Sequence, residues 1–196
     1  MNTKALRIVQ LVAGCLAAFV ALFFLIEGIL FLTDISGEEG TAKWNVYVII
    51  AALLALAAAT GLAIFGTYLI LSFVRNQDGK KLAFFTLLTY LGYEVISTFI
   101  TMCFFGFNQG LPWVVVVFGI GGAVVLLLSV LLNLDKVTSG VLGFVGCGLG
   151  FIVSTMCLSN TGGLDVATEL FSMFTIIAVA VLFIFQFILE YNSKSE

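Results

Sequence analysis

Six long apolar segments, separated by short polar stretches, follow one another along the chain. They cover about residues 8–32, 44–74, 82–105, 112–132, 137–158 and 166–189. A helix needs about 20 apolar residues to cross a hydrocarbon core of about 30 Å, and each segment reaches that length. The alternation of apolar and polar residues that a membrane β-barrel needs is absent. The pattern therefore predicts an all-α polytopic membrane protein, a bundle of six transmembrane helices.

The connections between the segments are short, and only the acidic stretch at 33–43 forms a sizeable loop. Short loops make consecutive helices antiparallel neighbours in a bundle. No polar stretch is long enough to build a core of its own. We therefore expect residues 1–196 to form a single transmembrane domain.

Lysine and arginine residues set the expected orientation. If the amino terminus is inside, all eight basic residues except Lys43 fall at the inner ends of segments. Cytoplasmic loops of membrane proteins carry such an excess of lysine and arginine. We therefore predict a multi-pass protein of the plasma membrane, with both termini in the cytoplasm.

Composition agrees with this class and narrows the expected partners. The chain is 62% hydrophobic and 10% charged, whereas a soluble domain usually carries about 25% charged residues. A net charge of −3, with no basic patch, argues against nucleic-acid binding. The lipid bilayer is the first expected partner, and another membrane subunit or a second copy of the chain stays open.

Glu94 stands out because it lies near the middle of the third apolar segment. At about 1.5 Å per helical residue, it is about 20 Å from Lys81 and about 21 Å from Asn108. An ionisable group at the centre of the hydrocarbon is costly and usually marks a functional site. Polar residues recur on the same helix face at helical spacing, and this stripe should face the bundle interior or a wet cavity. Its members are Thr86, Tyr90, Glu94, Ser97 and Thr101.

The chain offers Glu94 no basic partner within the membrane, because its lysines and arginines lie at segment ends and histidine is absent. Three interpretations stay open. The carboxyl group is protonated and hydrogen-bonded to tyrosine, serine or threonine hydroxyls. Alternatively, it binds a cation, a proton or a cationic ligand reversibly, or it pairs with a basic group of another subunit.

Glu27 is a second intramembrane carboxylate, about 10 Å inward from Asp34 at helical rise. At that depth, one interpretation is that Glu27 makes a polar contact at the outer edge of the membrane. If the first and third helices adjoin, Glu27 and Glu94 instead mark successive stations of one outward path.

The residue types that many enzymes and metal sites need are missing. Without histidine there is no Ser-His or Cys-His dyad and no histidine-ligated zinc or haem. The four cysteines form no CxxC motif, so we predict no metal site, no cofactor and no enzymatic activity. Cys103 and Cys157 lie near the external ends of their helices, and are either bridged or two small core residues.

Small residues give the fifth segment a face that allows close helix contact. Gly143, Gly146 and Gly150 belong to this face. Such a face either packs against helices of the same chain or docks a partner membrane subunit. The spacing alone does not separate the two.

Two functions follow from these patterns. The first is a membrane transport component, a small-molecule or ion binding or permeation subunit, in which Glu94→Gln abolishes binding or uptake. The second is a non-catalytic membrane scaffold or accessory subunit that holds other membrane proteins through small-residue faces, in which Glu94→Gln is nearly silent. The ligand path of the first function uses Tyr90, Glu94, Ser97, Thr101 and Glu27.

Overall fold

The structure is a computed structural model that describes residues 3–33, 42–75, 77–106, 110–132, 136–158 and 164–193. Its helices are α1 Thr3–Thr33, α2 Ala42–Val74, α3 Lys80–Phe105, α4 Gly110–Leu131, α5 Lys136–Leu158 and α6 Leu164–Ser193. All six are long and apolar enough to cross a membrane, and the described ranges contain no strand. The predicted all-α membrane bundle is therefore confirmed. Most of the acidic loop at 33–43 lies outside the described residues.

Local signals define both ends of α3. Before the helix, the Asp78 side chain accepts a hydrogen bond from the Lys80 backbone N–H at 2.9 Å. After it, Gly106 adopts a positive φ of 96°, which glycine tolerates without a Cβ clash. Its N–H donates to the Met102 carbonyl at 2.8 Å. These contacts pair backbone groups that a helix terminus would otherwise leave unsatisfied.

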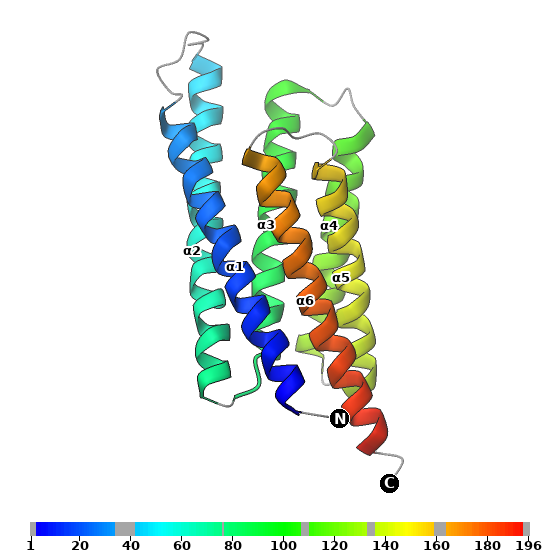
Figure 1. Ribbon diagram of the computed structural model, residues 1–196. Helices are drawn as coiled ribbons and strands as arrows, with labels where there is room; N and C mark the ends of the chain where they lie inside the picture. Colours follow the sequence, from blue (N-terminus) through cyan, green and yellow to red (C-terminus); the bar gives the residue numbers. More distant parts are fainter. Residues whose placement is uncertain are drawn as a thin grey trace.

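The helices form a closed ring, and α3 is the member of the ring that also reaches the helices across it. Each helix packs against the next one along the chain, and α6 returns to α1 (Figure 1). Within the described ranges, α3 also contacts α1, α5 and α6, so it touches all of the other helices. The helix that carries the predicted polar stripe is therefore the one that contacts every other helix of the described chain.

Helix α1 begins and α6 ends at the same end of the bundle (Figure 1). We call this end the terminal end and the opposite one the distal end. That the terminal end is cytoplasmic stays a prediction from the distribution of lysine and arginine.

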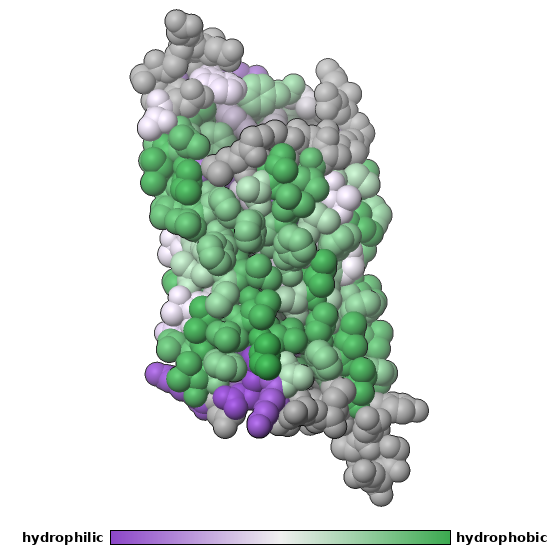
Figure 2. Space-filling model, in the orientation of Figure 1, coloured by the Kyte–Doolittle hydropathy of each residue, from purple (hydrophilic) through white to green (hydrophobic). Residues whose placement is uncertain are grey.

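The face of the bundle seen in Figure 2 is apolar along most of its length, with hydrophilic side chains gathered near its ends. Large apolar side chains such as Phe19, Leu53, Phe99 and Val117 are between 49% and 62% exposed. A continuous apolar surface of this extent is characteristic of contact with something other than water. It supports the predicted contact with the lipid bilayer.

Two glycines bring the backbones of α1 and α2 close together. A Cβ atom added to Gly14 would lie 3.0 Å from the Gly66 carbonyl oxygen. A Cβ atom added to Gly66 would lie 3.1 Å from the Gly14 carbonyl oxygen. Because any larger side chain would meet backbone at both positions, α1 and α2 form a tightly joined hairpin.

Gly143, Gly146 and Gly150 of α5 pack against helices of the same chain. An added Cβ atom would lie 2.3 Å from the Phe183 ring of α6 at Gly143, and 2.6 Å from Leu126 of α4 at Gly146. At Gly150 it would lie 3.5 Å from Leu91 of α3. The docking of a partner subunit on this face stays a prediction.

We expect Gly143→Ala to lower the free energy of unfolding by about 1–3 kcal/mol, because the added methyl group overlaps the buried Phe183 ring. Thermal unfolding of the purified protein in detergent measures the change. Gly148→Ala is the matched control, since nothing lies within 4 Å of its added Cβ atom. The higher helix propensity of alanine should leave that variant as stable as the parent or more so. Equal melting temperatures for the two variants would contradict the packing at Gly143.

Candidate functional site

A cavity of about 490 Å³ lies in the distal half of the bundle, and all six helices contribute to its wall. On α3 the lining residues run from Tyr93 to Gly106, so Glu94 lies at the deep end of the cavity. Thr101, Phe105 and Gly106 are exposed. The cavity therefore reaches the surface of the described chain at its distal end.

The polar stripe of α3 is divided between the protein core and this cavity. Thr86 and Tyr90 are 0% and 4% exposed and lie toward the terminal end of the helix. Glu94, 5% exposed, lines the cavity together with Ser97 and Thr101. Glu94 thus lies at the boundary between the buried and the cavity-lining parts of the stripe.

Glu94 of α3 faces Glu169 of α6, and Cys157 of α5 lies beside both. One carboxylate oxygen of each glutamate and the Cys157 sulfur lie within 4.8 Å of one another. The Cys157 Sγ donates a hydrogen bond to Glu94 Oε2 at 3.2 Å. Both glutamates are 5% exposed, and both line the cavity. The fold thus brings two buried carboxyl groups together, and we call them the carboxyl pair.

Two hydroxyl groups hold the Glu169 carboxyl group in place. Tyr90 OH donates to Glu169 Oε2 at 2.8 Å, and Ser154 Oγ donates to the same oxygen at 2.7 Å. Both donors are buried, and such donors satisfy and orient a buried carboxyl group. Tyr90, which was expected on the ligand path, supports the carboxyl pair from behind and is not among the described residues that line the cavity.

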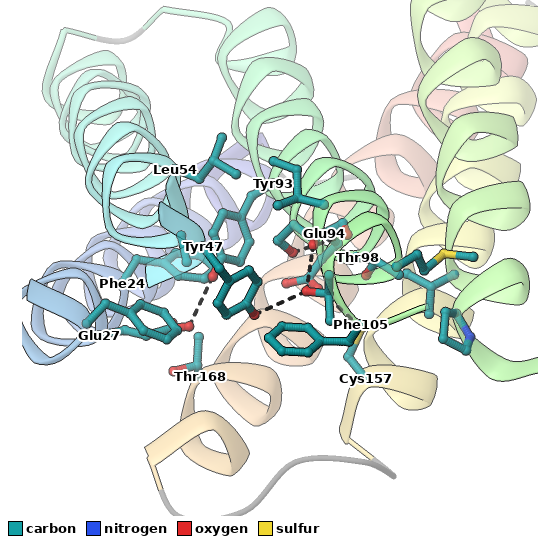
Figure 3. Close-up of a pocket in the computed structure, with 18 of the residues that line it drawn as sticks. Phe24, Glu27, Tyr47, Leu54, Tyr93, Glu94, Thr98, Phe105, Cys157 and Thr168 are labelled. Atoms are coloured by element: carbon teal, nitrogen blue, oxygen red, sulfur yellow. Dashed lines mark hydrogen bonds between the residues drawn. The ribbon is translucent and has the colours of Figure 1, made fainter. Parts of the chain in front are cut away.

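Glu27 of α1 lines the same cavity. Its Oε1 accepts a hydrogen bond from Tyr93 OH at 3.0 Å, and the Tyr93 ring packs on Phe24 with ring centroids 4.3 Å apart (Figure 3). Helices α1 and α3 therefore adjoin at this level, which is the condition under which Glu27 and Glu94 share one path. That they act in succession stays a prediction.

Aromatic rings and apolar side chains make up much of the remaining wall. Tyr47 OH and Thr101 Oγ1 are 3.2 Å apart, within hydrogen-bonding distance. The Tyr47 ring meets Phe105 edge-on, with centroids 4.8 Å apart (Figure 3). The charged side chains that the described lining residues present are all carboxyl groups. The aromatic lining residues are Phe24, Phe31, Tyr47, Tyr93 and Phe105.

Cys103 and Cys157 are both free thiols, so the structure contains no bridge between them. Cys103 is exposed on α3, whereas Cys157 is a hydrogen-bond donor in the cavity wall. The scattered cysteines predicted no metal site. The fold nevertheless places Cys157 beside the carboxyl pair, where the three residues offer ligand atoms of the kind that hold a positive ion.

Glu169 is the residue of the site that the sequence analysis missed. It lies near the start of α6, which begins at Leu164, and a carboxylate there suggests the membrane interface. Helices α1 and α3 extend past the start of α6 (Figure 1). Because both pack against α6, its first turns lie inside the bundle. A signal was present in the sequence, because a second polar face recurs at helical spacing and is buried in the structure. Its members are Thr168, Glu169, Ser172 and Thr175.

The carboxyl pair is suited to holding a positive charge. Two ionised groups within 4.8 Å of each other repel by at least about 3.5 kcal/mol at an effective dielectric constant of about 20. A cation or a shared proton between them replaces this repulsion by attraction. Comparison of the chain with protein-family models, with curated proteins and with solved structures gives no match.

Proposed function

We propose that this integral membrane protein is a transport component that binds a cationic solute in the distal cavity. The carboxyl pair carries the proposal, because two buried carboxyl groups from different helices face each other at the deep end of a cavity that reaches the surface. The solute enters from the distal end and binds between Glu94 and Glu169.

The hydrogen bonds around the pair support a binding role over a purely structural one. Tyr90 and Ser154 both donate to Oε2 of Glu169, and Cys157 donates to Oε2 of Glu94. These bonds fix the positions of both carboxyl groups before a ligand arrives. Such preorganisation lowers the cost of binding, whereas a structural hydrogen bond would not need a cavity beside it.

The packing of α5 favours this function over that of a scaffold. Gly143 and Gly146 are in close contact with α6 and α4 of the same chain. A partner helix would have to displace these contacts to use the same face. Among the described residues, the cavity therefore supports cation binding more strongly than the small-residue face of α5 supports a scaffold function.

Thermal unfolding of the purified protein in mild detergent tests cation binding. The probes are the chlorides of sodium, magnesium, manganese(II), zinc and phenethylammonium. A ligand at 100 times its dissociation constant stabilises the folded state by about 2.7 kcal/mol, so at least one probe should raise the melting temperature. Glu94→Gln and Glu169→Gln should each remove that rise. Asp78→Asn, at an exposed carboxylate near the terminal end, should keep it.

Proteoliposomes then separate transport from binding. The cation that stabilises the protein should cross the membrane of vesicles that contain the parent protein, and should not cross in vesicles that contain Glu94→Gln. If no probe raises the melting temperature, or if the rise survives in both glutamine variants, the carboxyl pair does not bind a cation. Stabilisation without any flux would overturn the transport role.

A further inference from the structure

We propose that the cavity takes an organic ammonium ion, a protonated primary amine attached to an apolar and preferably aromatic body. This inference rests on the proposed function and names the chemical class of its cation. The combination of a carboxyl pair at the deep end with an aromatic wall in the same cavity carries it.

The size of the cavity exceeds what a single ion needs. Its volume of about 490 Å³ falls in the range of about 300–1,000 Å³ that is typical of small-molecule sites. The carboxyl pair occupies only the deep end, at Glu94 and Glu169, while the lining of α3 continues to Gly106. The space between these positions suits a ligand with a body attached to its charged group.

The wall has the composition that an apolar body requires. Rings from α1, α2 and α3 surround the space, and Leu54, Ile100 and Val115 add aliphatic surface. Aromatic faces attract cations as well as apolar groups, so these rings also favour an ammonium group that passes them. Glu27, in the wall contributed by α1, adds a third carboxyl group that raises the local concentration of cations.

The carboxyl pair matches the hydrogen-bonding pattern of a primary ammonium group. An –NH₃⁺ group carries three N–H donors and no acceptor, and carboxylate oxygens are acceptors. Glu94 and Glu169 present such oxygens from two different helices, within 4.8 Å of each other. Charge-assisted hydrogen bonds of this kind are about twice as strong as neutral ones.

The same groups fit a bare metal ion less well. Calcium takes about six to eight oxygen ligands, and magnesium requires an octahedral shell of oxygens. The third group beside the pair is the Cys157 sulfur, and the wall beyond it is largely apolar and aromatic. Zinc binds cysteine as the thiolate, which would end the hydrogen bond from Cys157 to Glu94.

Isothermal titration calorimetry of the full chain in detergent tests the proposed class, with phenethylammonium chloride as the probe. Methylammonium carries the charge without the body, 2-phenylethanol carries the body without the charge, and zinc and manganese(II) chlorides represent metal ions. We expect phenethylammonium to bind at least about 10-fold more tightly than either part alone, because it uses both the carboxyl pair and the aromatic wall.

Two variants assign the binding to its groups. Glu94→Gln should weaken phenethylammonium binding by about 10- to 100-fold, because one charged acceptor becomes neutral. Tyr47→Leu, at a half-buried wall position, should weaken phenethylammonium binding several-fold and leave methylammonium unchanged. Tyr47→Leu removes no buried charge, so it remains informative if a substitution at the carboxyl pair impairs folding.

Each other outcome overturns a defined part of the proposal. Equal affinities for phenethylammonium and methylammonium would overturn the claim that the wall binds an apolar body of the ligand. Tighter binding of zinc or manganese(II), dependent on both Glu94 and Glu169, would overturn the ammonium class while leaving cation binding in place. Binding of no probe, or binding that is indifferent to both glutamates, would overturn this inference and the proposed function together.

Discussion

Removing both hydroxyl donors from the Glu169 carboxyl group is expected to destabilise the protein strongly. Tyr90→Phe and Ser154→Ala each remove a hydrogen bond to a buried carboxylate oxygen, at a cost of about 1–3 kcal/mol apiece. Because both donors share Glu169 Oε2, the double variant should lose more stability than the sum of the single losses. A double-mutant cycle of unfolding free energies in detergent measures this coupling.

Tyr93→Phe is the matched control for this experiment. It also removes a tyrosine hydroxyl from a glutamate, but that glutamate, Glu27, is half-buried and lines the cavity. Water can replace the lost donor there, so the cost should stay below about 1 kcal/mol. If Tyr93→Phe costs as much as Tyr90→Phe, burial of the Glu169 carboxyl group is not what makes its donors important.

The second large effect concerns Glu94→Gln, which we expect to stabilise the protein without ligand and to remove its response to cations. When both carboxyl groups are ionised, a glutamine ends their repulsion, and its amide N–H₂ donates to the Glu169 carboxylate. The gain should be about 1–3 kcal/mol in the free energy of unfolding. Paired melting curves, with and without phenethylammonium chloride, measure both changes in the same samples.

This result would identify the pair as a site that gives up stability for binding, as functional sites often do. Asp78→Asn again serves as the control, because it removes a charge near the terminal end while an asparagine still accepts the hydrogen bond before α3. A Glu94→Gln protein that is less stable than the parent and that still responds to the probe would show that the Glu94 carboxyl group is structural.

The helices and the burial of Glu94 were predictable because each depends on one segment alone. A run of about 20 apolar residues predicts a membrane helix, and the spacing from Thr86 to Thr101 predicts a polar face turned away from lipid. In the structure α3, which carries that face, contacts every other helix, and Glu94 is buried among them. In α3, the face that the polar residues predict to be turned away from lipid is the face that the other helices cover.

The partner of Glu94 was not predictable, because it depends on how two helices distant in the chain are placed. Short loops determine that α3 lies beside α2 and α4, but they do not determine which turn of α6 meets α3. That register places Glu169 opposite Glu94. The position of α5 along the bundle likewise places Ser154 and Cys157 beside the pair. Periodicity in one helix carries no information on axial shift between helices.

The close contact of Gly14 with Gly66 has a mechanical consequence for the cavity. Because two backbones in such close contact resist sliding, we expect α1 and α2 to move together. Glu27 is carried by α1 and Tyr47 by α2, so an acidic group and an aromatic ring of the wall travel together. A movement of the two helices would change their contacts with the rest of the bundle, at ring pairs such as Phe24 with Tyr93, Phe23 with Phe171 and Phe65 with Phe85. A movement of α1 and α2 would therefore change the width of the cavity and the position of the Glu27 carboxyl group at the same time.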